Sequence, residues 1–140
     1  MPSHQHSLRF TASREAFEQA FSAFRMALGS CDLPGRARYH AELAFEEVVS
    51  NIMRYGGAEG RSPDVAIAIA AEPEAIVLTF EDDGAPFDPL SRPAPARPAS
   101  LDEAPLGGLG LLLLRKTSAH LHYVRTADAK NRLIVTIATR

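Results

Sequence analysis

Two adjacent carboxylates, Asp82 and Asp83, end an apolar strand and are followed at once by Gly84 in the stretch "LTFEDDGAPFDPL" (78–90). Asp-Gly between alternating hydrophobic residues is by itself a strong signal for a hairpin turn. The preceding apolar side chains recur with period two, at Ile76, Leu78 and Phe80. Asp82 therefore continues the inward row, whereas Asp83 belongs to the outer row and can be a solvated acid. Because an unpaired buried carboxylate is very costly, the pattern predicts a polar group over Asp82.

A second polar pair, Glu47 and Asn51, lies upstream in "FEEVVSNIMRYG" (45–56). Residues four apart share one face of a helix, and this pair falls close beside Tyr55 at the edge of the apolar arc. One interpretation is an ordinary solvated pair. The other is a carboxylate and an amide that hold a divalent cation or orient a water, since Mg²⁺ prefers hard oxygen ligands.

The third feature is a glycine loop, "GGLGL" (107–111), which opens an apolar helix. Free backbone N–H groups at a helix start bind anions, but the loop fits neither G-x-G-x-x-G nor the P-loop. Tight helix packing explains these glycines as well as phosphate binding does. The segment "SRPAPARPASLDEAP" (91–105) before it is too rich in proline for helix or central strand. Such long loops are lids, binding loops or disordered linkers, and its position favours a lid.

The elements that must position these residues follow from periodicity. We expect a strand at 7–12, a helix from the N-cap Ser13 to Gly29 and a second helix from Pro34 to Gly56-Gly57. Strands at 64–72 and 74–82, a helix within 107–119 and a hairpin at 120–126 and 131–139 complete the chain. This order lacks regular strand-helix alternation. It predicts a single α+β domain over 1–140, a two-layer sandwich with helices on one face of a largely antiparallel, mixed sheet.

Composition bounds the function. The chain has 140 residues, of which 46% are hydrophobic and 23% charged, as expected for one globular domain. The net charge of −2 gives no sign of nucleic-acid binding, and the single Cys31 excludes an internal disulfide and a multi-cysteine metal site. No apolar run is long enough to span a membrane, and the N-terminus lacks a signal-peptide core. We therefore expect a cytoplasmic protein whose residues 1–6, including His4 and His6, are flexible.

Together, the three features resemble a known ATPase superfamily. "FEEVVSNIMRYG" is similar to the N-box, E-x-x-x-N, of DNA gyrase, the large heat-shock chaperone, sensor histidine kinases and the mismatch-repair protein MutL. "EDDGAPFDP" resembles its D-x-G box, and "GGLGL" its second glycine box. The ordered set covers roughly residues 8–138. The wording "D-x-G-x-P-F-D-P" and the short length most resemble bacterial anti-sigma-factor serine kinases, which implies an ATP-binding fold of the Bergerat type.

The resemblance implies a role for each matched residue. Glu47 would be the base that activates the attacking hydroxyl, and Asn51 would be a Mg²⁺ ligand. Asp82 would accept a hydrogen bond from the adenine amino group, Gly84 would let the backbone approach the ring, and Asp83 would be a bystander.

The remaining nucleotide contacts are also implied by the resemblance. They fall on Pro86 and on the phosphate-binding block Gly107, Gly108, Leu109, Gly110 and Leu111, with a lid at about 88–106. Arg115 and Lys116 are expected along the helix surface. The chain departs from many relatives in having Tyr55 where they have histidine, which can alter how the phosphate end is organised.

Two functional classes follow. The first is a serine/threonine protein kinase that uses ATP and Mg²⁺ to phosphorylate an anti-anti-sigma protein and so regulates a sigma factor. The second is a non-catalytic, nucleotide-gated module that grips a protein partner. The detached catalytic domain of a histidine kinase is a weaker third alternative. We expect no direct contact with nucleic acid or membrane, and a homodimer is left open.

Overall fold

The computed structural model describes residues 4–57, 60–91 and 108–140. The strands in this part of the chain are β1 (His4–Thr11), β2 (Asp64–Ala71), β3 (Ala75–Asp82), β4 (His120–Arg125) and β5 (Asn131–Ala138). The helices are α1 (Arg14–Gly29), α2 (Gly35–Tyr55), the short 3-10 helix η1 (Pro89–Ser91) and α3 (Gly108–Thr117). Apart from the short η1, these elements agree with the predicted ones to within a few residues.

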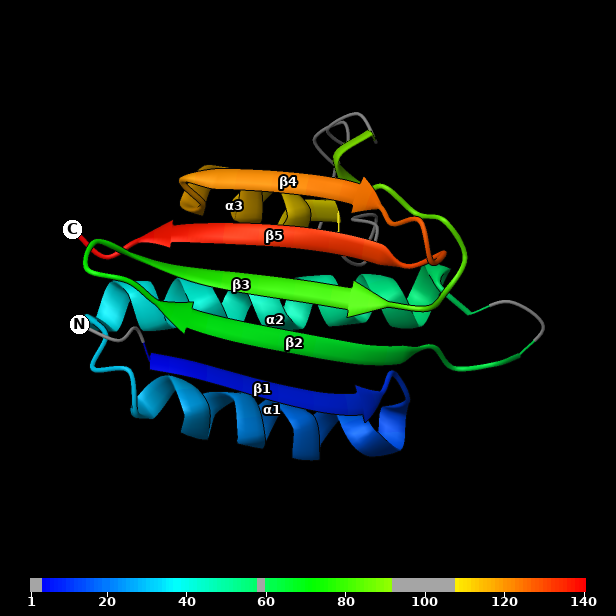
Figure 1. Ribbon diagram of the computed structural model, residues 1–140, viewed down its shortest axis with the longest axis horizontal. Helices are drawn as coiled ribbons and strands as arrows, with labels where there is room; N and C mark the ends of the chain where they lie inside the picture. Colours follow the sequence, from blue (N-terminus) through cyan, green and yellow to red (C-terminus); the bar gives the residue numbers. More distant parts are fainter. Residues whose placement is uncertain (1–3, 58–59, 92–107) are drawn as a thin grey trace.

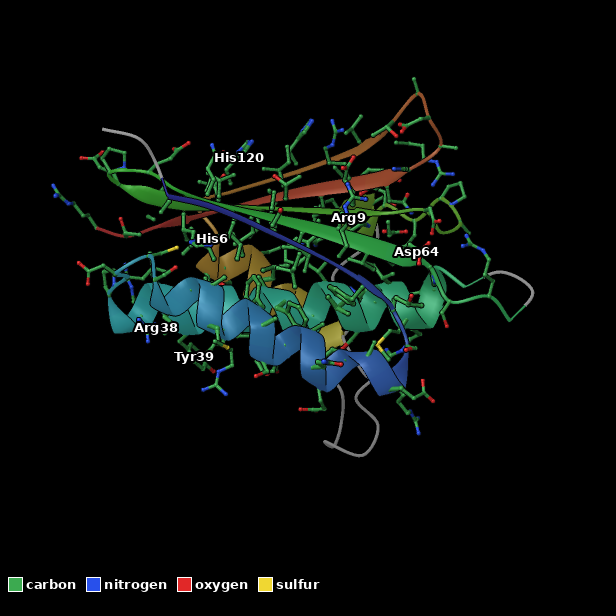
Figure 2. The ribbon with its side chains drawn as sticks, turned by 60° about the horizontal axis from the view of Figure 1, so that its bottom comes forward. His6, Arg9, Arg38, Tyr39, Asp64 and His120 are labelled. Carbon is green, nitrogen blue, oxygen red and sulfur yellow. The ribbon has the colours of Figure 1, made fainter. Side chains whose placement is uncertain are left out.

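The five strands form one sheet in the order β1-β2-β3-β5-β4, and every neighbouring pair is antiparallel. The three α-helices lie on one face of this sheet (Figure 1). Arg9 and His120 lie on the opposite face, while Arg38 and Tyr39 lie on the outer side of the helical layer (Figure 2). The predicted two-layer α+β fold is confirmed. Because no described strands pair in parallel, the sheet is antiparallel rather than mixed.

The core fills the space between the sheet and the helices. The inward row of β3 is fully buried, with Ile76, Leu78 and Phe80 at most 1% exposed. Phe45 of α2 is the centre of an aromatic cluster, with ring centroids 4.9 to 5.9 Å from those of Phe10, Phe17, Phe21 and Phe24. Aromatic pairs of this kind stabilise a fold by about 0.5–1.5 kcal/mol beyond their buried area. The cluster fixes α2, and with it the face that carries Glu47 and Asn51.

The first strand corrects one prediction. It begins at His4 rather than Ser7, because β2 offers partners to all of β1 and His4 pairs with Ala71. His6 faces the helices, and its Nε2 lies 2.8 Å from the Oγ of Ser30 at the end of α1. The predicted flexibility of residues 1–6 is therefore wrong for residues 4–6.

The predicted lid at 88–106 is described only at its start. Asp88 caps η1, since its Oδ1 accepts a hydrogen bond of 2.8 Å from the Leu90 N–H. Residues 92–107, and with them most of the lid and Gly107, lie outside the described residues. Within the described chain, the helices are too short or too polar to cross a membrane.

Candidate functional site

A pocket lies between the sheet and the helices α2 and α3, at the end of the sheet where β3 finishes. The space at this point, with the open solvent at its mouth included, is about 380 Å³. The pocket is lined by Val48, Asn51, Ile52, Phe80, Asp82, Phe87, Pro89, Leu114, Tyr123, Asn131 and Leu133. Its wall is therefore mostly apolar, with a few polar groups, among them Asn51 and Asp82.

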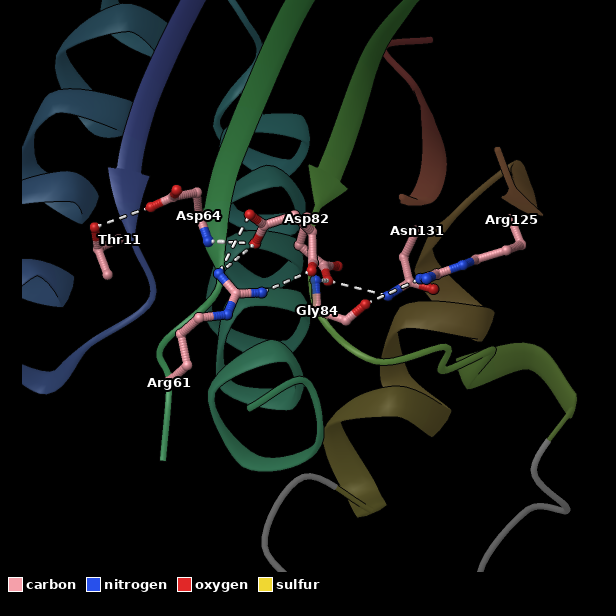
Figure 3. Close-up of polar contacts among 8 residues, drawn as sticks. Thr11, Arg61, Asp64, Asp82, Gly84, Arg125 and Asn131 are labelled. Atoms are coloured by element: carbon pink, nitrogen blue, oxygen red, sulfur yellow. Dashed lines mark hydrogen bonds and ion pairs between the residues drawn. The ribbon is translucent and has the colours of Figure 1, made fainter. Parts of the chain in front are cut away.

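The position of Asp82 confirms the prediction from the alternation of residues along the strand. The residue is 6% exposed at the inward end of β3 and lines the pocket. Its Oδ1 accepts hydrogen bonds from the Gly84 N–H at 2.9 Å and from Asn131 Nδ2 at 3.0 Å (Figure 3). Within residues 4–57, 60–91 and 108–140, no hydrogen bond reaches Oδ2. Burial raises the pKa of Asp82, while these two donors oppose the shift. A ligand that donates a hydrogen bond to Oδ2 would give this second oxygen a partner.

Asn131 is the site residue that sequence reasoning missed. It is the direct cross-strand neighbour of Asp82 in the β3–β5 pairing and is 5% exposed. The signal for it was the strand parity of β5, whose inward row begins at Asn131. That row could be aligned with Asp82 only once the register of two strands distant in sequence was known. The polar group predicted over Asp82 is thus supplied first by the protein itself.

Asp83 points outward as predicted, and it makes contacts that join two strands. Its Oδ1 accepts a hydrogen bond of 2.8 Å from the Asp64 N–H, and Arg61 lies 3.3 Å from its Oδ2 (Figure 3). Burial raises the pKa of Asp83, but the bonds from Asp64 and Arg61 lower it by more, so the pKa lies below its ordinary value. The carboxylate therefore ties the end of β3 to the start of β2.

The packing around position 84 requires a glycine there, which the sequence did not reveal. A Cβ at this position would lie 2.6 Å from the backbone oxygen of Gly56, closer than any real contact of that kind. The same oxygen accepts a hydrogen bond of 3.0 Å from the Ala85 N–H. Gly84 thus lets the loop after β3 pack directly on the end of α2. Pro86, predicted to touch the nucleotide, is exposed and is not part of the pocket wall.

Glu47 and Asn51 lie one turn apart on α2, but their settings differ. Asn51 is 8% exposed and lines the pocket, and no described residue forms a hydrogen bond with its amide. The Oε2 of Glu47 is buried without a hydrogen-bond partner among the described residues. Burial, followed by Glu46, raises the pKa of Glu47, and Arg54 offsets this only in part. A half-buried carboxyl group with a raised pKa and one oxygen without a partner is a candidate general base.

The loop after Asp82 is held against α2 and β5. The rings of Tyr55 and Phe87 stack with centroids 4.7 Å apart, and the Phe87 N–H donates to Asn131 Oδ1. Tyr55, where many relatives have histidine, thus supports the pocket wall.

Arg115 was expected on the helix surface, but it is half-buried and donates to the Pro89 and Leu90 carbonyls. It therefore links α3 to η1. The backbone of Gly108, Leu109, Gly110 and Leu111 forms the start of α3, which agrees with their predicted place at a helix N-terminus.

Comparison with known proteins agrees with this geometry. Residues 10–137 match the model of the histidine kinase-like ATPase domain. The chain is 31% identical over 101 residues to the serine/threonine-protein kinase BtrW of Bordetella bronchiseptica, a match that covers 72% of this chain and 70% of that protein. The fold is similar to that in the crystal structure of the RsbU and RsbW domains of Rv1364c from Mycobacterium tuberculosis.

The structural match has a TM-score of 0.65 at 16% identity. It covers 99% of this chain and 34% of that chain, so this likeness concerns the fold alone. The match to the family model, by contrast, spans residues 10–137, and the three motifs of the sequence analysis lie within that range. This chain belongs to the histidine kinase-like ATPase domain family.

Proposed function

We propose that this protein is an ATP-dependent serine/threonine protein kinase of the anti-sigma-factor type. It would phosphorylate a serine on an anti-anti-sigma partner and thereby regulate a sigma factor. The observation that carries the proposal is the arrangement on α2 and β3. Asp82 and Asn51 line one pocket, and Glu47, whose Oε2 has no hydrogen-bond partner among the described residues, lies one helical turn from Asn51. The 31% identity to a serine/threonine-protein kinase supports the class of reaction.

The apolar pocket and Asp82 would bind the adenine base. Apolar side chains such as Ile52 and Leu114 line it, which suits a flat aromatic ring. Asp82 Oδ2 would accept a hydrogen bond from the exocyclic amino group, which explains why a carboxylate is kept at a buried strand end. The start of α3 would direct backbone N–H groups at the phosphates.

Magnesium and the transfer step fall to α2. The Asn51 amide oxygen fits a Mg²⁺ ion, which commonly takes only one or two protein ligands beside substrate phosphates and water. The described residues contain no cluster of three or more histidine, cysteine or acidic side chains that could hold a metal, so phosphate oxygens would supply most of the coordination. When bound, the ion neutralises phosphate charge. The Glu47 carboxylate would accept the proton of the attacking serine hydroxyl.

One observation favours a second function, a nucleotide-gated binding module without catalysis. Glu47 is not part of the pocket wall that the described residues form. If the carboxylate does not reach the acceptor hydroxyl, ATP at the same site would only control how tightly a protein partner binds.

The deciding experiment is phosphoryl transfer from γ-labelled ATP. The purified protein is incubated with Mg²⁺ and the product of a neighbouring gene, and the label is traced by phosphoamino acid analysis. We expect phosphoserine on the partner, and no label on a partner whose acceptor serine is replaced by alanine. Tight ATP binding without transfer would support the binding module instead.

A further inference from the structure

The side-chain amide of Asn131 forms hydrogen bonds through both its nitrogen and its oxygen. Its Nδ2 donates to Asp82 Oδ1 at 3.0 Å and to the Ala85 carbonyl oxygen at 2.9 Å. Its Oδ1 accepts from the Phe87 N–H at 3.2 Å and from the Tyr123 hydroxyl at 2.5 Å. A flipped amide would place its oxygen against the Asp82 and Ala85 acceptors and its NH₂ group against the Phe87 N–H, which cannot accept a hydrogen bond. The orientation of the side chain is therefore fixed by its partners.

This orientation decides what Asp82 can offer a ligand. Oδ1 is held by two donors from the protein, and the carboxylate can present only acceptor lone pairs through Oδ2 while it is ionised. A protonated carboxyl would be different, because it could donate a hydrogen bond to a carbonyl oxygen. The ionisation state of Asp82 therefore sets which purine edge fits.

We propose that Asn131 is the positioning residue that makes this pocket select a 6-amino purine over a 6-oxo purine. The inference rests on the proposed function, in which the base amino group meets Asp82. Asn131 acts through Asp82, because its N–H stabilises the charged carboxylate and holds its plane.

Other groups around Asp82 bear on its charge. Asp83 on β3 opposes ionisation, while Arg125 on β4 favours it and donates to the Gly84 carbonyl oxygen at 3.0 Å. The Tyr123 hydroxyl on β4 is engaged by Asn131. The residues that α2 and α3 contribute to the pocket wall are uncharged: Val48, Asn51, Ile52 and Leu114. Burial raises the pKa of Asp82, so the donor from Asn131 is the main side-chain group that counters it.

The test is Asn131→Asp, which replaces a donor by a second carboxyl at the same distance from Asp82. Two carboxylates that share a buried site cannot both ionise, so the pair retains a proton. The probes are ATP and inosine triphosphate, which carries an oxygen in place of the 6-amino group. Because one mismatched buried hydrogen bond is involved, native protein should prefer ATP roughly tenfold or more. In Asn131→Asp, the ratio of the affinity for ATP to that for inosine triphosphate should fall toward one. It should come closer to one as the pH is lowered.

Two further variants guard the interpretation. Tyr123→Phe removes a hydrogen bond to the Oδ1 of Asn131 and leaves the donor to Asp82 in place, so it should keep the native ratio. The serine side chain in Asn131→Ser is uncharged but too short to donate a hydrogen bond to Asp82. This variant therefore provides a second test if Asn131→Asp does not fold. This variant should lower the affinity ratio, because it weakens the binding of ATP more than the binding of inosine triphosphate.

The outcomes are distinct. Absence of ATP binding in the native protein would overturn the proposed function. Clear ATP binding with equal affinity for inosine triphosphate would overturn the selectivity inference alone. The same inference fails if native protein prefers ATP and both Asn131 variants retain that preference at every pH.

Discussion

Glu47→Gln is expected to slow phosphoryl transfer by roughly 10²–10⁴-fold, the usual effect of removing a general base. ATP affinity should hold or rise, because the change removes a negative charge near the triphosphate. Paired measurements of nucleotide affinity and transfer rate separate these effects. Glu46→Gln is the matched control, since Glu46 is the exposed neighbour on the same helix and should leave both quantities unchanged. Normal turnover of Glu47→Gln would remove Glu47 from the chemistry.

The same variant gives a stability test that needs no partner. Burial raises the pKa of Glu47, so the folded protein binds this proton more tightly than the unfolded chain does. The resulting stabilisation is present below the unfolded pKa and is lost as the pH rises through the folded pKa. Glu47→Gln should therefore be more stable than native protein at neutral pH, and the gain should shrink in mild acid. Chemical denaturation at several pH values measures the difference, and a gain independent of pH would contradict the buried setting of Oε2.

Asp82→Ala is expected to abolish measurable ATP binding, while Asp83→Ala leaves it nearly intact. Leaving the buried amino group of the ligand without an acceptor costs roughly 1–3 kcal/mol of binding free energy. Gly84 and Asn131 would also lose their hydrogen-bond partner. Asp83→Ala should instead lower the free energy of unfolding, because its contacts with Arg61 and Asp64 are structural.

Calorimetric titration of both variants, together with their denaturation curves, tests this division. Asp82→Asn serves as the isosteric variant in case Asp82→Ala does not fold, and it should also weaken ATP binding because one acceptor oxygen becomes a donor. Equal losses of ATP affinity at positions 82 and 83 would contradict the assignment of the inward acid.

Local periodicity predicted much of the fold. Alternation along 74–82 placed Asp82 inside and Asp83 outside, and helical spacing placed Glu47 and Asn51 on one face beside Tyr55. These inferences needed only the pitch of a strand or a helix, so one sequence was enough. The order of the elements predicted helices on one face of a largely antiparallel sheet, but not that all its described strand pairs are antiparallel.

Features that depend on contacts between distant segments were missed. Asn131 meets Asp82 through the β3–β5 register, and Gly84 meets Gly56 where a loop packs on a helix end. Arg115 of α3 donates to the carbonyl oxygens of η1. Local periodicity does not predict these contacts, because the residues are 25 to 49 positions apart in the sequence.

The central claim is that the pocket between α2, β3 and β5 binds ATP through Asp82. A crystal structure with Mg²⁺ and a non-hydrolysable ATP analogue tests it most directly. The account predicts the adenine amino group within hydrogen-bond distance of Asp82 Oδ2, with the Asn51 amide oxygen in the coordination shell of the metal. A nucleotide bound elsewhere, or a base whose amino group does not meet Asp82, would contradict the claim.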